Sequence, residues 1–115
     1  MRTLNDYFLT AEIEDISTAS STFVAVPDGG RIIKIITALQ GAISGANAGI
    51  SFEIGGTAVT GGGITVAHSG SAAGTVDTAE PTAANSVSED GTIEIITDGA
   101  STGSKKLLVT FVIRR

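Results

Sequence analysis

The chain has 115 residues and no cysteine, which is enough for one domain and excludes disulfide bonds, thiolate metal sites and a cysteine nucleophile. Acidic residues outnumber basic ones by 12 to 7, and the resulting net charge of −5 argues against binding to nucleic-acid phosphates. The hydrophobic content of 42% comes mainly from Ile, Val and Ala, which stand beside 15 Gly. This composition is typical of an all-β protein.

The predicted elements are all strands. Leu9, Ala11 and Ile13 alternate with polar residues, which indicates a strand with one face in water. Further strands are expected at 22–26, 31–39, 50–54, 57–60, 64–68, 75–78, 92–97 and 105–113. Turn residues separate them, as at 27–30, where the sequence reads PDGG. We therefore expect an antiparallel β-sandwich of about eight or nine strands over residues 9–115, preceded by a short N-terminal arm, residues 1–8.

Membrane insertion and export are not expected from this sequence. The N-terminus lacks the apolar stretch of a secretory signal. The uncharged run at 35–52 contains Gly41, Gly45 and Gly49, but polar residues interrupt it, so it is interpreted as strands joined by a turn. The chain is predicted to be a soluble protein that is made in a cytoplasm and contacts neither membrane nor nucleic acid.

Apolar residues occur on both faces of the strand at 31–39. Ile33, Ile35 and Leu39 share one face by alternation, and Ile32 and Ile36 share the other. A two-layer sandwich buries only one face of each sheet. The second face is therefore predicted to remain open to water in a single subunit.

The strand at 105–113 repeats this pattern, with Leu108 and Val112 opposite the face that carries its other large apolar residues. Burying one such side chain contributes roughly 1.5–3 kcal/mol, so a second subunit is the economical cover for both strands. The predicted oligomer interface consists of Ile32, Ile36, Leu108 and Val112. The alternative is that the loop at 69–88 folds over these faces.

No catalytic, metal or cofactor site is predicted. His68 lies near Ser69, Ser71 and Asp77, but scattered Ser and Thr produce such neighbours without forming a triad. The acidic residues at 89–98 lack the ordered loop of a calcium site, and the glycine clusters lack the lysine of a phosphate loop. We therefore do not expect an enzyme.

Several segments resemble small structural proteins of tailed bacteriophages. They are VPDGGRIIK at 26–34, GGTAVTGGGITV at 55–66, SGSAAG at 69–74, PTAAN at 81–85 and LVTFVIRR at 108–115. The resemblance covers residues 23–115 and implies a capsid decoration, or cement, protein. It further implies a sandwich of jelly-roll type on the outer capsid surface of a virion, commonly as a homotrimer, with the major capsid protein as partner and no cofactor.

Two groups of residues are candidates for the capsid contact. In the arm, Leu4, Tyr7 and Phe8 offer apolar and aromatic anchors, although a frayed terminus is the alternative. At the other end of the chain lies a basic cluster that follows an acidic body: Lys105, Lys106, Arg114 and Arg115. This cluster either meets carboxylates of a neighbour or of the capsid protein, or serves solubility, or pairs within its own chain.

A receptor- or glycan-binding module on the virion surface is the competing function. Sugar sites usually present an exposed aromatic ring beside polar side chains. This chain has one Tyr, four Phe and no Trp, and Phe23, Phe52 and Phe111 fall on predicted strands where burial is expected. The aromatic residues therefore favour the capsid role over the adhesin role.

Overall fold

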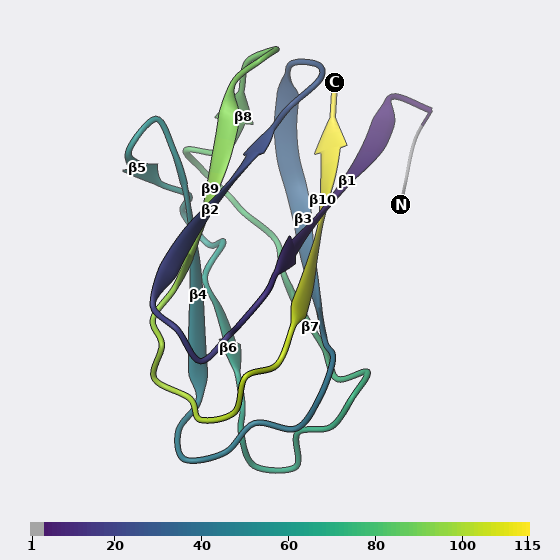
Figure 1. The fold of residues 1–115 in the computed structure, drawn as a ribbon. Coiled ribbons are helices and arrows are strands. Elements are labelled where there is room, and N and C mark those ends of the chain that lie inside the picture. The colour runs from purple at the N-terminus through teal and green to yellow at the C-terminus, as the bar shows by residue number, and fades with distance from the viewer. Residues whose placement is uncertain (1–3) are drawn as a thin grey trace.

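The computed structural model describes residues 4–115 as two antiparallel sheets that pack face to face (Figure 1). Sheet A has the order β1 (Asp6–Ile13), β10 (Leu107–Arg114), β3 (Gly30–Leu39) and β7 (Val76–Ala79), and β8 (Ser86–Val87) also pairs with β3. Sheet B has the order β2 (Ser20–Ala25), β9 (Thr92–Thr97), β4 (Ala48–Ile54) and β5 (Thr57–Ala58), and β6 (Ile64–Val66) also pairs with β4. The predicted antiparallel β-sandwich is confirmed.

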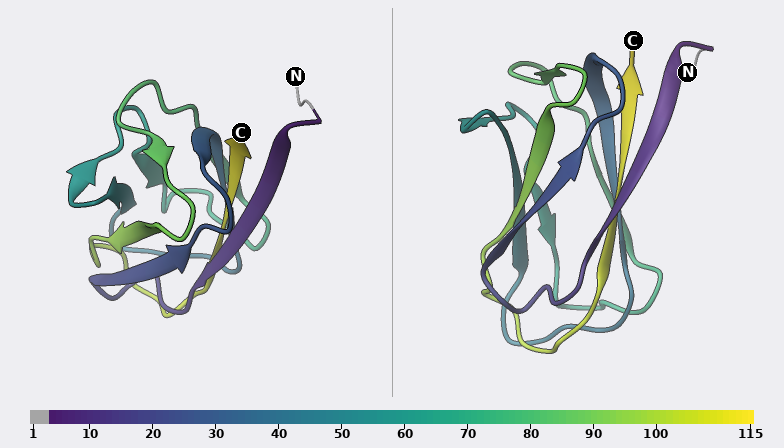
Figure 2. Two further views of the ribbon diagram at one scale, coloured as in Figure 1. Left: turned by 90° about the horizontal axis from the view of Figure 1, so that it is seen from above. Right: turned by 45° about the horizontal axis from the view of Figure 1, so that its top comes forward.

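The strand order is nested, because β1 pairs with β10 in one sheet and β2 pairs with β9 in the other. Figure 2 shows the two layers from above, with β1 and β2 lying on the same side of the sandwich. This nesting of early and late strands is the topology of a jelly roll. Within residues 4–115, no helix is long and apolar enough to cross a membrane.

The core lies between the sheets and contains the inward-facing residues that alternation predicts. Phe111 of β10 and Phe52 of β4 meet edge to face at its centre, with ring centroids 5.6 Å apart. Leu107, Val109 and Ile113 are also fully buried on the inner face of β10. The predicted inner face of this strand therefore matches the observed burial, whereas Val112 on the predicted outer face is only 1% exposed, so its predicted exposure to water is wrong.

A β-bulge in β3 changes the facing of its first residues. Lys34 lies opposite Val112, whereas Ile32 lies opposite Ile113, so Ile33 is an extra residue between two paired positions. The bulge shifts the alternation by one, and Ile32 is therefore completely buried in the core. The predictions that Ile32 faces outward and that Ile33 shares a face with Ile35 are wrong for this reason.

Sheet A extends beyond the predicted strands at two places, in the predicted arm and in the segment 69–88, where a strand is expected at 75–78 alone. Strand β1 begins at Asp6 and pairs with β10 along its whole length, so Tyr7 and Phe8 are strand residues rather than part of an arm. The segment 69–88 contributes β7 and β8 to the far edge of the sheet, instead of covering the outer face. Of the predicted arm, residues 1–3 lie outside the described residues.

Candidate interaction surfaces

The outer face of sheet A carries a band of apolar side chains. Cross-strand register places Phe8, Val112 and Lys34 in one row and Glu12, Leu108, Ala38 and Val76 in another. A row of Thr10, Thr110, Ile36 and Thr78 lies between them, and the hydroxyl groups of Thr10 and Thr110 are 3.1 Å apart. We call these residues the sheet A outer face.

Exposure on this face increases from its centre to its edges. Val112 is only 1% exposed although it points away from the core, and Ile36 and Leu108 are half-buried. At the two edges, Phe8 is 62% exposed and Val76 is 58% exposed. Three of the four predicted interface residues, Ile36, Leu108 and Val112, thus share one face.

The C-terminal arginines are bonded to other parts of the same chain. The Nε of Arg114 lies 2.8 Å from a carboxylate oxygen of Asp6, whose side chain is 1% exposed, and this hydrogen bond raises the pKa of Arg114. Arg115 forms an ion pair of 3.2 Å with Asp28 and lies over the ring of Tyr7. The start of β1, the last two residues of the chain and the turn at 27–30 are held together here.

Tyr7 belongs to the same cluster, because its hydroxyl donates a hydrogen bond to the backbone carbonyl of Asp28. Burial is the main reason that the pKa of Tyr7 lies above its ordinary value of 10.0. The aromatic ring that was predicted as a capsid anchor therefore fixes the 27–30 turn to β1. Leu4, by contrast, is fully exposed.

The two lysines of the basic cluster lie at the opposite end of β10. Lys106 forms an exposed ion pair of 3.7 Å with Glu12. The aliphatic part of Lys105 passes over Gly41, where an added Cβ would come within 2.7 Å of its Cδ. The basic cluster is thus divided between two ends of the molecule, and Lys106, Arg114 and Arg115 form ion pairs within the chain.

The outer face of sheet B is acidic and carries an exposed aromatic ring. Phe23, Glu94 and Glu53 lie side by side on neighbouring strands, and the hydroxyl of Ser21 donates to Glu94 over 2.8 Å. Phe23 is 63% exposed, so its predicted burial is wrong. The inward positions of β2 belong to the alternate residues, including Val24, and this leaves the ring on the outside.

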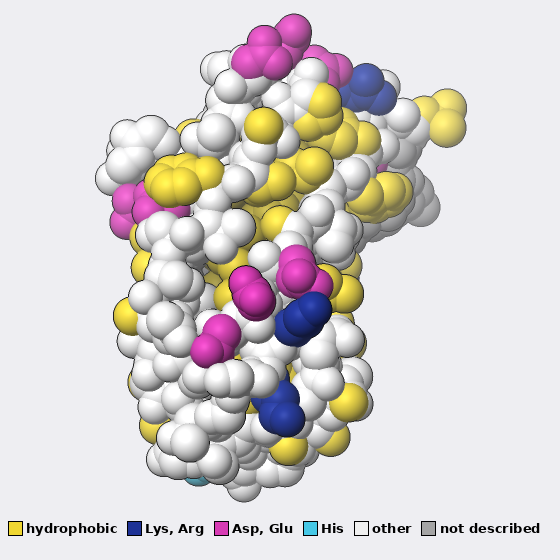
Figure 3. Space-filling view, viewed as in Figure 1, with side chains coloured by type: hydrophobic (Ala, Val, Ile, Leu, Met, Phe, Trp, Pro, Cys, Tyr) yellow, Lys and Arg dark blue, Asp and Glu magenta, His cyan; other side chains and the backbone are white. Residues whose placement is uncertain are grey.

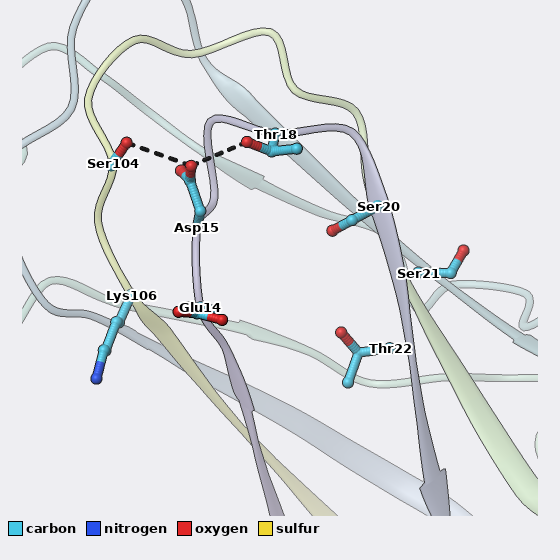
Figure 4. A pocket seen from close by; sticks show the side chains of 8 residues that line it. All are labelled: Glu14, Asp15, Thr18, Ser20, Ser21, Thr22, Ser104 and Lys106. Carbon is cyan, nitrogen blue, oxygen red and sulfur yellow. Dashed lines mark hydrogen bonds between the residues drawn. The ribbon is translucent and has the colours of Figure 1, made fainter.

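A groove of about 620 Å³ opens where β1 ends and β2 and β10 begin (Figure 4). Its lining is polar and consists of Glu14, Asp15, Thr18, Ser20, Ser21, Thr22, Ser104 and Lys106. Asp15 accepts hydrogen bonds from the backbone and hydroxyl of Ser17 and from the hydroxyls of Thr18 and Ser104. These bonds, chiefly the one from the Ser17 hydroxyl, lower the pKa of Asp15.

The residues around His68 do not assemble into a catalytic triad. The Nδ1 atom of His68 lies 2.8 Å from the side-chain oxygen of Asn47, and the Ser71 hydroxyl lies within hydrogen-bonding distance of the carbonyl oxygens of Ile43 and His68. Both side chains therefore connect the start of the loop after β6 to the loop at 43–47 through hydrogen bonds. Among residues 4–115, no group of three or more His, Asp and Glu side chains could hold a metal ion.

Comparison with known proteins relates the chain to others through its fold. The sequence matches no known protein-family profile and no curated protein. The structure is similar to a chain of the acidic stable capsid structure of Helicobacter pylori bacteriophage KHP30, with a TM-score of 0.62 and 13% identity. That match covers 96% of this chain and 87% of the capsid-structure chain.

The structure is also similar to part of dimeric latent PorU from Porphyromonas gingivalis, with a TM-score of 0.52 and 14% identity. This match covers 96% of the present chain but only 13% of the PorU chain. At these identities the similarity concerns the fold. It assigns no residue of this chain a role.

Proposed function

We propose that this chain is a structural protein of a bacteriophage virion that binds the outside of the capsid as a homotrimer and joins neighbouring capsomers. In this role it is a decoration protein without catalytic activity, and its partner is the major capsid protein. The observation that carries the proposal is the fold match to a chain of the KHP30 capsid structure, which extends over nearly the full length of both chains.

The relation to PorU carries less weight for function. There the same fold corresponds to a small part of a much longer chain, whereas the KHP30 capsid-structure chain has almost the same extent as this one. A fold that matches most of a chain in a capsid structure supports a structural role in a particle more directly than a match to a small part of a much longer chain.

The sheet A outer face supplies the surface for self-association in this proposal. Ile36 and Leu108 are half-buried at its centre, and the exposed side chains of Phe8 and Val76 extend the apolar area to both edges. A monomer gains little by placing so much apolar surface on an outer face, whereas a neighbouring copy would remove it from water. A trimer carries three copies of the same capsid contact. Once one copy has bound, the other two bind at high effective concentration, so modest individual contacts give strong attachment.

A second candidate is a receptor- or glycan-binding module, and one observation favours it. Phe23 is exposed beside Ser21 and Glu94, so an aromatic ring with polar neighbours is present on the outer face of sheet B. Such a combination can hold the apolar face of a sugar. The Ser21 hydroxyl is, however, already engaged by Glu94, which leaves fewer polar groups for a ligand.

Co-sedimentation distinguishes the two functions. The purified chain is mixed with capsids of the phage that encodes it, stripped of the chain, and in parallel with host cells. The decoration role predicts saturable binding to capsids and a molar mass in solution of three chains. Binding to cells but not to capsids, with loss of cell binding on Phe23→Ala, would replace it by the adhesin role.

A further inference from the structure

The free edge of β1 presents backbone groups that no other strand within residues 4–115 uses. Arg115 donates its backbone N–H to the carbonyl of Asn5, so these two residues are a hydrogen-bonded pair of the ladder between β1 and β10. Hydrogen-bonded and non-hydrogen-bonded pairs alternate along an antiparallel ladder. By that alternation, the N–H and C=O groups of Phe8, Thr10 and Glu12 point away from β10. Strand β1 is the last strand of its sheet, so these groups face outward from the sandwich.

Strand β2 has a free edge on the same side of the molecule. Val26 donates its N–H to the carbonyl of Gly91, so the backbone groups of Ser21, Phe23 and Ala25 point away from β9. The edges of the two sheets thus border one side of the sandwich, as the right-hand view of Figure 2 shows for β1 and β2.

The strands on the opposite side of the sandwich are protected against such pairing. They are short, with four residues in β7, two in β8, two in β5 and three in β6. Pro81 follows β7, and Asp77 points a carboxylate inward from it. Short strands, proline and inward charges are the usual ways in which proteins protect sheet edges. By contrast, β1 has eight residues and β2 has six, without proline or lysine in either.

The space between the two free edges is apolar. Leu9, Ala11 and Val24 point toward the core from β1 and β2 but remain partly exposed, whereas Ile13 at the closed end of β1 is 2% exposed. Figure 3 shows apolar side chains at the surface between β1 and β2 in the upper part of the view. An inserted strand would cover these side chains.

The lower end of this side is acidic. Glu14 borders the groove that follows β1, and it forms no ion pair within residues 4–115. Glu12, near the end of β1, forms an exposed ion pair of 3.7 Å with Lys106. A strand that pairs with β1 would place a side chain beside Glu12, and Glu14 follows just beyond the end of the strand, so a basic residue is favoured at this end of the added segment.

We propose that the edge of β1 is a strand-addition site for an extended segment of the capsid protein; this inference rests on the proposed function. The segment is about five residues long, the extent of the free edge from Phe8 to Glu12. It is apolar at alternating positions, which face Leu9 and Val24, and it carries a Lys or Arg at the end that lies beside Glu12. Main-chain hydrogen bonds supply the affinity and the side chains supply the specificity.

The symmetry of the proposed trimer favours this occupant over a second copy. Two β1 edges can pair with each other only around a twofold axis, because the same segment must meet itself. A trimer has no such axis between its subunits. The β1 edges of a trimer therefore remain free, and each is available to the capsid.

The test removes one free N–H group from the edge. Thr10→Pro eliminates an N–H that points away from β10, and proline is tolerated in an edge strand at such a position. Thr10→Val is the matched control, because it keeps the N–H and loses only the hydroxyl contact with Thr110. Ala25→Pro makes the same backbone change on the β2 edge. We expect Thr10→Pro to weaken capsid binding at least about tenfold, and the two other variants to bind as the parent does.

Amide hydrogen exchange tests the same edge without a substitution, in case Thr10→Pro does not fold. We expect the amides of Phe8, Thr10 and Glu12 to exchange rapidly in the free protein and slowly on capsids, and that of Phe23 to exchange rapidly in both. Unchanged exchange in β1 on bound capsids would overturn the inference and leave the proposed function intact. Protection before capsids are added would assign the edge to a second copy, and absence of capsid binding would overturn the proposed function itself.

Discussion

Phe111 and Phe52 are edge to face at an angle of 87°, and they join sheet A to sheet B through the centre of the core. Both rings are essentially inaccessible to water. Phe111 lies one position away from Val112, which points to the opposite side of the same strand. Alternate residues of β10 therefore point into the core and toward the outer face of sheet A.

The aromatic pair should contribute more to the free energy of unfolding than burial of the two separate rings would. We expect Phe52→Leu and Phe111→Leu to be coupled by about 0.5–1.5 kcal/mol in a double-mutant cycle, measured by chemical denaturation. Phe8→Leu, an exposed substitution, serves as the control and should be additive with Phe52→Leu. Additivity of the two core substitutions would mean that edge-to-face contact adds nothing to burial.

The architecture was predictable because alternation and turn residues are local signals. All nine predicted strands have counterparts in the structure, and only the two-residue β8 was not expected. The bulge in β3 was not predictable in the same way, since Ile32 and Ile33 are chemically equivalent and only the register with β10 decides which one is buried. The error in the predicted interface follows directly from this.

The surface was harder to predict than the core. The exposure of Phe23 could have been found, because Val24 and Val26 of the same segment alternate with it and already fill the inward positions. The ion pairs of Arg114 and Arg115 could not, since their partners Asp6 and Asp28 are more than eighty residues away in the chain. Only the folded sheet brings these charges together.

The oligomer prediction is best tested by a charge at the centre of the sheet A outer face. We expect Ile36→Asp to reduce the molar mass in analytical ultracentrifugation to that of one chain, with an unchanged far-UV spectrum, because a buried carboxylate would be desolvated at the interface. Ile96→Asp is the matched control, since Ile96 is half-buried on the outer face of sheet B. A parent protein that is monomeric, or an Ile36→Asp variant that stays trimeric, contradicts the assigned interface.

Asp15 should make stability depend on pH in the acid range. Its pKa is lower in the folded chain than the ordinary 3.8, because Ser17, Thr18 and Ser104 donate hydrogen bonds to the charged form. The stabilisation is therefore fully present above pH 3.8 and is lost as the pH falls through the lower folded pKa. Thermal unfolding midpoints of the parent and of Asp15→Asn should differ at neutral pH and converge at strongly acidic pH. If the difference between the two midpoints did not change with pH, the loss of stability would come from the asparagine side chain itself rather than from loss of the Asp15 charge.

Glu53 and Glu94 lie directly opposite each other on β4 and β9, where two like charges oppose pairing of the strands. We expect Glu53→Lys to raise the free energy of unfolding by about 0.5 kcal/mol, because it replaces repulsion by attraction across the strands. Glu53→Gln should give part of this gain, since it removes only the repulsion. Urea denaturation at low and at high salt is the measurement. Both gains should shrink at high salt because the charges are screened. If Glu53→Lys is no more stable than the parent at low salt, the two carboxylates do not repel each other in the parent, and a bound cation neutralises them.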